Sequence, residues 1–380
     1  MKSPHKPAFE LQLLCKLLAL RPSQEECLSD LRAPGFCWDL FLQLAEYHGV
    51  IGFLYEALTE TGLAREVPPK LLEALRHSTL VLLEEHLQHR SAIRKTLETL
   101  NAAGLEFIVI KGWSHAESLH GNPCARPITD LDLLVHDTKA AQALLKQQRL
   151  PDPSIVDWHI YPTNTSDLPS RMRCLQLDIQ TLWADSRLAT ITDTPARVLS
   201  PADQVIALVI DFTISHGFGR LLLLKEILLL AEKVGWDALV KRAQLFQADI
   251  LLYLTLRMGE ELLRFPVPLD ILKILGTRLR QEEHWLEKRL IQNPLFTPAR
   301  YFCIPILLPS WADRLSFAKE LLWPPPYWFE LRSEKPSLWR HLIHDATLIG
   351  KACAILWNVR GRSCNFAKGA GKNPFFPKTG

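Results

Sequence analysis

The spacing of hydrophobic positions changes twice along the chain. In the first hundred residues apolar positions recur at helical spacing, as Leu42, Ala45 and Phe53 do on one predicted helix face. Short apolar runs rich in β-branched residues follow, and helical spacing returns from Ser200 onward. This order predicts helices, then a small α/β or α+β unit, then helices again.

The middle unit is predicted to alternate strands with helices. Strands are expected at residues 106–110, 129–135, 155–161 and 174–182, and helices at 113–120 and 138–148. The chain is therefore predicted to be an α+β protein with a small mixed-sheet core over residues 102–190. The flanking parts are a helical N-terminal region (1–101), a helical C-terminal domain (191–360) and a flexible basic tail (361–380).

Composition places the chain among globular proteins. Of its 380 residues, 48% are hydrophobic and 22% are charged, which excludes a disordered, collagenous or rod-like protein. The formal net charge of +3 is too small to indicate a nucleic-acid binder. Residues 331–380 carry nine Lys or Arg against two acids, and we expect this segment to be a solvated tail rather than an anion-binding one.

The cysteines and the apolar segments indicate a cytoplasmic protein. None of the eight cysteines forms a Cys-x-x-Cys pair, which argues against a zinc ribbon or a thioredoxin motif. Reduced cysteines are the expectation for the cytosol. No run reaches the roughly 18 uninterrupted apolar residues of a membrane span, and residues 11–20 lack the features of a secretion signal.

The clearest chemical signal is the run Arg-Pro-Ile-Thr-Asp-Leu-Asp-Leu-Leu-Val at residues 126–135. Side chains alternate faces along a strand, so Asp130 and Asp132 point to one face while Leu131 and Leu133 enter the core. Two carboxylates this close repel one another unless a cation lies between them. The pair therefore predicts a Mg²⁺ site, with Mn²⁺ as the alternative metal, that waters and the phosphates of a substrate complete.

A third acid is expected on the strand predicted at residues 174–182. Leu175, Leu177 and Ile179 alternate inward there, which places Asp178 on the opposite face. If this strand pairs beside the first, Asp178 joins the two aspartates in a cluster that suits a two-metal site. Such a site aligns an attacking oxygen, an α-phosphate and a leaving pyrophosphate, with Asp178 activating the acceptor.

A turn upstream of the aspartates is suited to bind phosphate. Lys111-Gly112-Trp113-Ser114 follows the first predicted strand, so its backbone amides face outward at a helix N-terminus. Gly112 permits close approach of a phosphate, and Lys111, Ser114 and Arg126 are candidates for contacts with phosphate oxygens. The alternatives are structural ion pairs for Lys111 and Arg126, and a helix cap for Ser114.

The histidines are expected to be structural. His86 and His89 share a predicted helix face, but no further clustered His or Cys completes a zinc site. His159 lies on the strand predicted before Asp178 and is expected to be buried with satisfied hydrogen bonds. His216, at a predicted helix end, is given the same interpretation.

The combination of Lys111-Gly112 with Asp130-x-Asp132 resembles the uncharacterised bacterial nucleotidyltransferases of the polymerase-β superfamily. The helices predicted within residues 37–58 and 199–239 resemble those of the same family. The resemblance implies an enzyme that binds an NTP with Mg²⁺ and transfers the NMP to an unknown hydroxyl or amine acceptor, with release of pyrophosphate. The implied acceptor is a small molecule, a peptide or a protein. The resemblance also implies that Asp130 and Asp132 are metal ligands and that Asp178 is the third acid.

Two departures from the family pattern keep other functions open. The usual Gly-Ser pair is Lys111-Gly112-Trp113-Ser114 here, and Gln180 stands where relatives commonly have a His two residues after the third acid. One alternative is a non-catalytic nucleotide-binding or scaffold protein that retains the fold. Another is transfer to an RNA 3′ end, which is disfavoured because the first 330 residues sum to a charge of −4 and show no obvious basic groove.

Overall fold

The computed structural model describes residues 9–114, 119, 126–128, 130–139, 141, 143, 155–162, 169–292 and 300–323. The chain divides into two units, Met1–Phe317 and Ala318–Gly380, and the sheet with nearly all of the described helices belongs to the first. The predicted basic tail, and most of the helices predicted at 113–120 and 138–148, lie outside the described residues.

The N-terminal region is helical, as its periodicity predicted. Its helices are α1 (Phe9–Leu17), α2 (Gln24–Leu31), α3 (Trp38–Tyr47), α4 (Ile51–Glu60), the 3₁₀ turn η1 (Leu63–Glu66) and α5 (Pro69–Ala102). The long helix α5 begins with Pro69 at its first position, where no intrahelical N–H is needed. It ends just before Gly104, whose φ of +68° is the left-handed conformation that terminates many helices.

The described strands form one five-stranded mixed sheet. The strands are β1 (Ile108–Val109), β2 (Leu131–Leu134), β3 (Val156–His159), β4 (Arg187–Ile191) and β5 (Thr194–Val198), in the spatial order β3-β2-β1-β5-β4. Strand β2 pairs with β3 in parallel and with β1 in antiparallel orientation. The predicted strands at 106–110, 129–135 and 155–161 are confirmed, and with them the mixed sheet.

The strand predicted at residues 174–182 is wrong. Those residues follow the 3₁₀ helix η4 (Pro169–Cys174) and enter the helix α8 (Ile179–Ala184). Asp178 is the N-cap of α8, and its carboxylate accepts hydrogen bonds from the Gln180 amide (3.0 Å) and the Thr181 hydroxyl (2.5 Å). A capping carboxylate stabilises the first turn of a helix. This stabilisation favours a helix from Ile179 onward, although the alternating apolar residues before it are typical of a strand.

Helices make up the described part of the chain after the sheet. They are α9 (Pro201–Ile210), the π-helix η5 (Asp211–Ser215), α10 (Leu221–Val234), α11 (Trp236–Leu245), α12 (Asp249–Leu263), α13 (Leu269–Gly276), α14 (Gln281–Gln292), α15 (Arg300–Leu307) and α16 (Trp311–Leu322). Helix α9 starts as its sequence predicted, with Pro201 at the first position and Ser200 accepting a hydrogen bond from the Asp203 amide.

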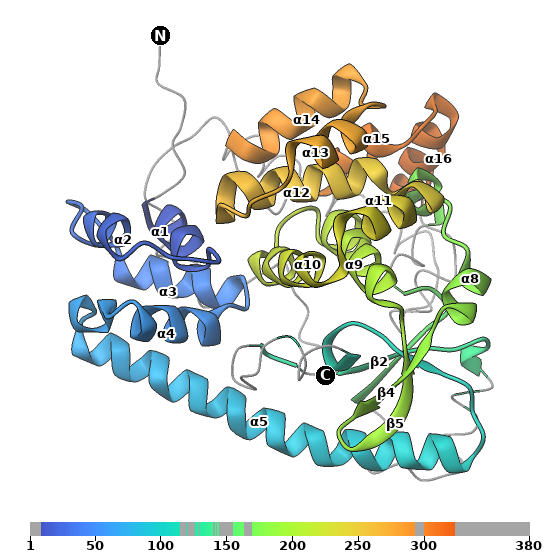
Figure 1. Ribbon diagram of the computed structural model, residues 1–380, viewed down its shortest axis with the longest axis horizontal. Helices are drawn as coiled ribbons and strands as arrows, with labels where there is room; N and C mark the ends of the chain where they lie inside the picture. The colour runs from blue at the N-terminus through green and yellow to red at the C-terminus, as the bar shows by residue number, and fades with distance from the viewer. Residues whose placement is uncertain are drawn as a thin grey trace. The chain divides into compact units, whose positions relative to one another are not determined.

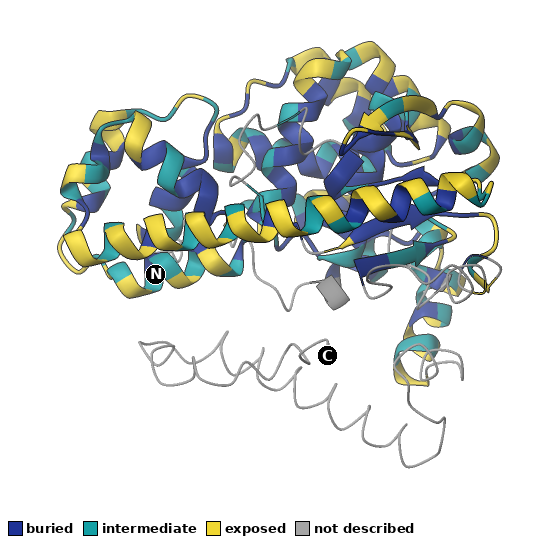
Figure 2. Cartoon of the chain, turned by 90° about the horizontal axis from the view of Figure 1, so that it is seen from below, coloured by how far each residue is buried: buried dark blue, intermediate teal, exposed yellow. Residues whose placement is uncertain are grey.

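Helices cover both faces of the sheet (Figure 1). Leu131 and Leu133 pack in one buried cluster with Ile93 and Leu97 of α5, which runs below the sheet in that view. Leu134 belongs instead to the larger cluster that includes α9 and α10, above the sheet. Seen from below, α5 presents an exposed outer face (Figure 2). Leu133 and Leu134, which are adjacent on β2, therefore pack into two different hydrophobic clusters on opposite faces of the sheet.

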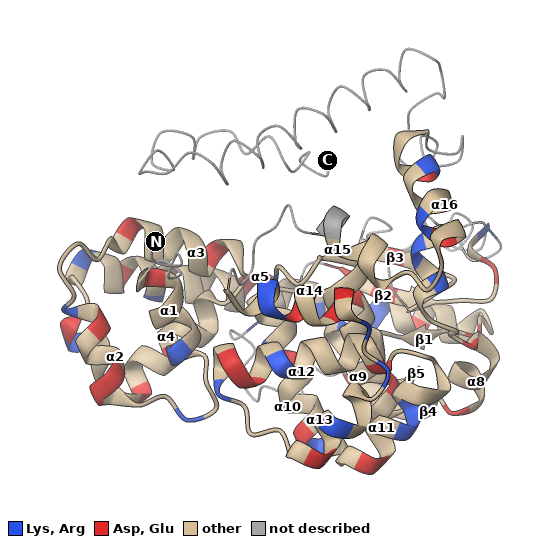
Figure 3. Cartoon of the chain, turned by 90° about the horizontal axis from the view of Figure 1, so that it is seen from above, with Lys and Arg blue, Asp and Glu red and all other residues tan. Residues whose placement is uncertain are grey.

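Lys and Arg positions are interspersed with Asp and Glu positions along the helices of the C-terminal region (Figure 3). Within the described residues, no helix has both the length and the hydropathy required to cross a membrane.

Candidate active site

Parallel pairing of β2 with β3 brings Asp132, Asp157 and His159 together. Asp132 is the register partner of Asp157, so these side chains lie next to each other and point to the same face. His159 is two residues further along β3 and therefore shares that face. One ligand atom from each of the three residues lies within 4.8 Å of the others.

The imidazole of His159 lies between the two carboxylates. Its Nε2 atom is 2.7 Å from Asp132 Oδ1 and 3.2 Å from Asp157 Oδ2. Because ionised carboxylates only accept hydrogen bonds, Nε2 carries a proton in this arrangement. The Asp132 side chain is 10% exposed and that of Asp157 is 44% exposed, so the group has a buried end and an open end.

Lys111 supplies a second positive charge at the buried end. Its Nζ atom lies 3.3 Å from Asp132 Oδ1, and its side chain is 10% exposed. The backbone of Lys111 has a φ of +53°, the left-handed conformation that non-glycine residues seldom adopt. Ser114 Oγ donates a hydrogen bond to the Lys111 carbonyl (2.5 Å), which fixes the turn that opens the helix after β1.

Mutual attraction keeps these groups charged in spite of their burial. Burial alone would lower the pKa of Lys111, but the carboxylates of Asp211 and Asp132 outweigh it and raise that pKa. Burial alone would raise the pKa of Asp132, but Lys111 and His159 hold it below its usual range. For His159, hydrogen bonds to Asp132 and Asp157 overcome burial and raise the pKa.

The donor set fits a divalent metal ion. Carboxylate oxygens are the ligands of Mg²⁺ and Mn²⁺, and an imidazole nitrogen is accepted by Mn²⁺ and by later transition metals. Asp132, Asp157 and His159 present these atoms within one small group. In the structure Lys111 and His159 balance the carboxylate charge, and a divalent ion bound to the two carboxylates would take over that role.

Among the described residues, the two other predicted acids fall outside the group of Asp132, Asp157 and His159. Asp130 is exposed and directly precedes β2, and it is not a member of the Asp132 group among the described residues. Asp178 is exposed at the N-cap of α8 and is not a member either. The strand that pairs with β2 is β3, and the acid that it contributes is Asp157. The expectation that Asp178 lies on this neighbouring strand is therefore wrong.

A signal for Asp157 was present in the sequence but was overlooked. Asp157-Trp158-His159 has an acid followed two residues later by a histidine, on a strand that was predicted correctly. Relatives commonly have a His two residues after the third acid. This His was taken to be missing because Gln180 follows Asp178, whereas His159 follows Asp157 at that spacing. His159 was expected to be buried, which is confirmed, but its place between two carboxylates was not foreseen.

Arg126 and Gly112 lie against each other beside this group. A Cβ atom added to Gly112 would overlap Arg126 Nη1, so any larger residue at position 112 would displace the guanidinium from this place. Arg126 Nε forms an ion pair at 2.6 Å with Glu226 Oε1 of α10. The ion-pair interpretation of Arg126 is thus confirmed, and its guanidinium also lies on the turn expected to bind phosphate.

Two helix α5 histidines support the same turn from the other side of the sheet. The ring of His86 stacks on that of Trp113, with centroids 4.9 Å apart. His89 Nδ1 lies 3.1 Å from the carbonyl oxygen of Ile128, just before β2. Both residues therefore hold the segments that carry Gly112 and Asp132, which agrees with their expected structural role.

Comparison with known proteins supports the resemblance drawn from the sequence. A family model described as an uncharacterised nucleotidyltransferase matches residues 34–264, which is more than half of the chain. The match runs from before α3 to the end of α12 and includes the sheet, the Lys111-Gly112 turn and the Asp132 group. No curated protein and no solved structure matches the chain.

Proposed function

The chain belongs to this uncharacterised nucleotidyltransferase family, and from that premise we propose that it moves an NMP from an NTP to a hydroxyl or amine acceptor and releases pyrophosphate. The acceptor is a small molecule, a peptide or a protein. The observation that carries the proposal is the in-register pairing of Asp132 with Asp157, with His159 between them, beside the Lys111-Gly112 turn.

Asp132 and Asp157 would hold the metal through their carboxylate oxygens, and the protonated His159, which balances them in the metal-free protein, would lie beside it. We propose Mg²⁺, with Mn²⁺ as the alternative. When bound, such an ion supplies positive charge that neutralises the triphosphate and stabilises the departing pyrophosphate. Asp130, exposed two residues before Asp132, is proposed as a further carboxylate at the entrance of the site.

The basic residues and the turn would hold the triphosphate. Lys111 and Arg126 provide charge, and the amides that follow Gly112 open a helix toward the same place. Asp157 is the more exposed of the paired carboxylates, so an acceptor can approach it. We propose that Asp157 takes the proton of the acceptor as the acceptor atom attacks the α-phosphorus and the bond to pyrophosphate breaks.

A pyrophosphate-release assay tests the transfer itself. The protein is incubated with Mg²⁺, each NTP in turn and fractionated pools of small molecules and peptides, and inorganic pyrophosphate is measured. We expect release that depends on one NTP and one fraction, and that falls by at least a hundredfold in Asp157→Asn. An NTP that binds tightly while no fraction supports release would instead favour the non-catalytic nucleotide-binding protein.

Transfer to RNA is a less favoured outcome of the same assay. Lys and Arg positions are interspersed with Asp and Glu positions along the helices drawn in Figure 3, and the formal net charge is only +3, which does not favour an RNA-binding protein. An RNA pool included among the fractions is therefore expected to give no release. Release with RNA alone would identify the acceptor as an RNA 3′ end.

A further inference from the structure

A buried carboxylate from outside the sheet holds one of the proposed phosphate-binding residues. Glu226 lies on α10, its side chain is fully buried, and its Oε1 atom is 2.6 Å from Arg126 Nε. The Arg126 side chain is itself only 13% exposed. The pair joins the C-terminal helices to the segment that leads into β2.

Stability alone does not account for this ion pair. Glu226 is part of the sequence LLLLKEILLLAEKV of α10, half of which is both apolar and buried. Removing two charges from water costs more than an apolar contact would, so well-packed hydrophobic replacements of buried ion pairs are often neutral or stabilising. A leucine at position 226 would extend the apolar face of α10 without this cost. An apolar contact is therefore not what selects the carboxylate at position 226, and Arg126 is the partner that the described residues give it.

The requirement is visible in the position of the guanidinium. Glu226 engages Arg126 through Nε, whereas Nη1 lies against Gly112 at the phosphate-binding turn. The guanidinium is planar, so an ion pair at Nε restrains the place of both Nη groups. Two N–H donors of a guanidinium held in one orientation can bind two oxygens of a phosphate.

A second acid of the C-terminal helical region acts on the other basic residue of the turn. The negative charge of Asp211, a buried residue of the π-helix η5, favours the charged form of Lys111. Asp211, like Glu226, comes from the C-terminal helical region. Helical segments with π-type bonding are frequently found at functional sites.

We propose that Glu226 is a positioning residue for triphosphate binding: it holds the Arg126 guanidinium so that its Nη groups face a phosphate at the Gly112 turn. This inference rests on the proposed function, since it needs an NTP in the site. It assigns to the C-terminal helices a part in binding the donor.

Glu226→Gln tests the proposal. The amide keeps the shape of the side chain but removes the charge that orients Arg126. We expect the Kd of one Mg²⁺–NTP, measured by isothermal titration, to rise about ten- to a hundredfold, the range of a lost charge-assisted hydrogen bond. The Kd of the corresponding NMP should change less than threefold, because the fork acts on the outer phosphates. A change confined to folding would alter both Kd values alike.

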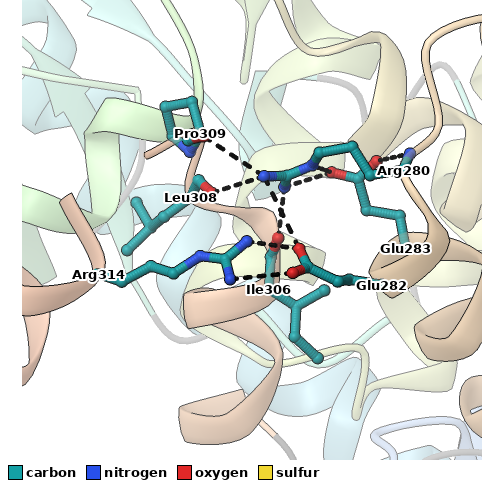
Figure 4. Close-up of polar contacts among 7 residues, drawn as sticks. All are labelled: Arg280, Glu282, Glu283, Ile306, Leu308, Pro309 and Arg314. Carbon is teal, nitrogen blue, oxygen red and sulfur yellow. Dashed lines mark hydrogen bonds and ion pairs between the residues drawn. The ribbon is translucent and has the colours of Figure 1, made fainter. Parts of the chain in front are cut away.

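Glu283→Gln is the matched control. Glu283 is also a fully buried carboxylate paired with an arginine, since Arg280 Nε lies 2.8 Å from its Oε1 atom. Figure 4 shows Arg280 reaching on to the carbonyl oxygens of Ile306 and Leu308, so this pair fastens α14 to the end of α15. Glu283→Gln should lower the Tm while leaving the NTP and NMP affinities unchanged.

Arg126→Lys provides a second test should Glu226→Gln fold poorly. Lysine keeps a positive charge for Glu226 but lacks the fork, so the same selective loss of NTP affinity is expected. The double variant should bind NTP no more weakly than Arg126→Lys alone, because both changes act through one group.

The outcomes separate this inference from the function on which it rests. Wild-type affinity for NTP in Glu226→Gln, or additive losses in the double variant, would overturn the positioning role and leave the proposed function intact. A wild-type protein that binds no NTP in the presence of Mg²⁺ would overturn both.

Discussion

The position of His159 between two carboxylates has consequences that a single substitution can expose. Without the imidazole, Asp132 and Asp157 lie next to each other, and Lys111 is the cation that remains paired with them among the described residues. Paired carboxylates repel, so His159→Ala should destabilise the metal-free protein by about 2 kcal/mol.

Added Mg²⁺ is expected to recover more stability in His159→Ala than in the wild type, because the ion replaces the lost positive charge. Urea unfolding of both proteins, with EDTA and with Mg²⁺, measures the two effects. Equal stabilisation of both proteins by Mg²⁺ would contradict a metal site at this group.

The sequence predicted the kind of site, carboxylates beside the Lys111-Gly112 turn, but not all of the residues that form it. Asp132, Lys111 and Gly112 were identified from motif spacing, and the structure brings them together. Asp157 was missed because only strand pairing decides which acid lies beside Asp132, and pairing between distant segments is not written in local spacing. Glu226 was missed because a lone acid in a leucine-rich helix has no local pattern.

At the scale of elements, helix α8 shows why one strand was mispredicted. Leu175, Leu177 and Ile179 alternate like a strand, yet Ile179, Leu182 and Trp183 also have helical spacing. Asp178 decides between the two by capping the helix. The hairpin β4–β5 was missed for a related reason: its turn residues Thr192 and Asp193 adopt positive φ without the glycine that usually marks such turns.

Asp178→Ala separates a helix cap from a catalytic acid. The substitution removes the hydrogen bonds to the Gln180 amide and the Thr181 hydroxyl, so a small decrease in the Tm is expected. Binding of Mg²⁺–NTP should be unchanged, in contrast to Asp157→Asn, in which it should be lost. Calorimetric titration of both variants makes the comparison. Loss of Mg²⁺–NTP binding in Asp178→Ala would instead indicate that Asp178 belongs to the nucleotide site.

At the scale of the molecule, both helical regions meet at the turn between α3 and α4. A Cβ atom added to Gly49 in that turn would be 3.4 Å from Leu222 of α10 and 3.7 Å from Pro127. Arg220 donates a hydrogen bond to the carbonyl oxygen of Tyr47 in the same turn. The segment before β2 is therefore fixed by elements more than 70 residues away on either side, which the sequence alone did not indicate.

A buried histidine at this junction makes the stability depend on pH. Burial, reinforced by the nearby charge of Arg220, lowers the pKa of His48 from 6.5 to about 3. Below pH 6.5 the unfolded chain binds a proton at His48 that the folded protein excludes, so the stability contributed at neutral pH is lost as the pH falls toward 3.

Between pH 6.5 and pH 5 this effect amounts to about 2 kcal/mol. Urea unfolding at both pH values should show that loss in the wild type, and a loss smaller by about this amount in His48→Gln. The same pH dependence in the two proteins would contradict burial of a neutral His48.

Thermal unfolding with each of the four NTPs, with and without Mg²⁺, tests the central claim most directly. The wild type is compared with Asp132→Asn, which keeps the shape of the side chain. One NTP at about 100 times its Kd should stabilise the wild type by about 2.7 kcal/mol, a Tm increase of roughly 3 °C for a chain of this size, and only with Mg²⁺. Asp132→Asn should show no increase. A shift of equal size without Mg²⁺ or in Asp132→Asn, or no shift with any NTP, would contradict a metal-dependent nucleotide site at the Asp132 group.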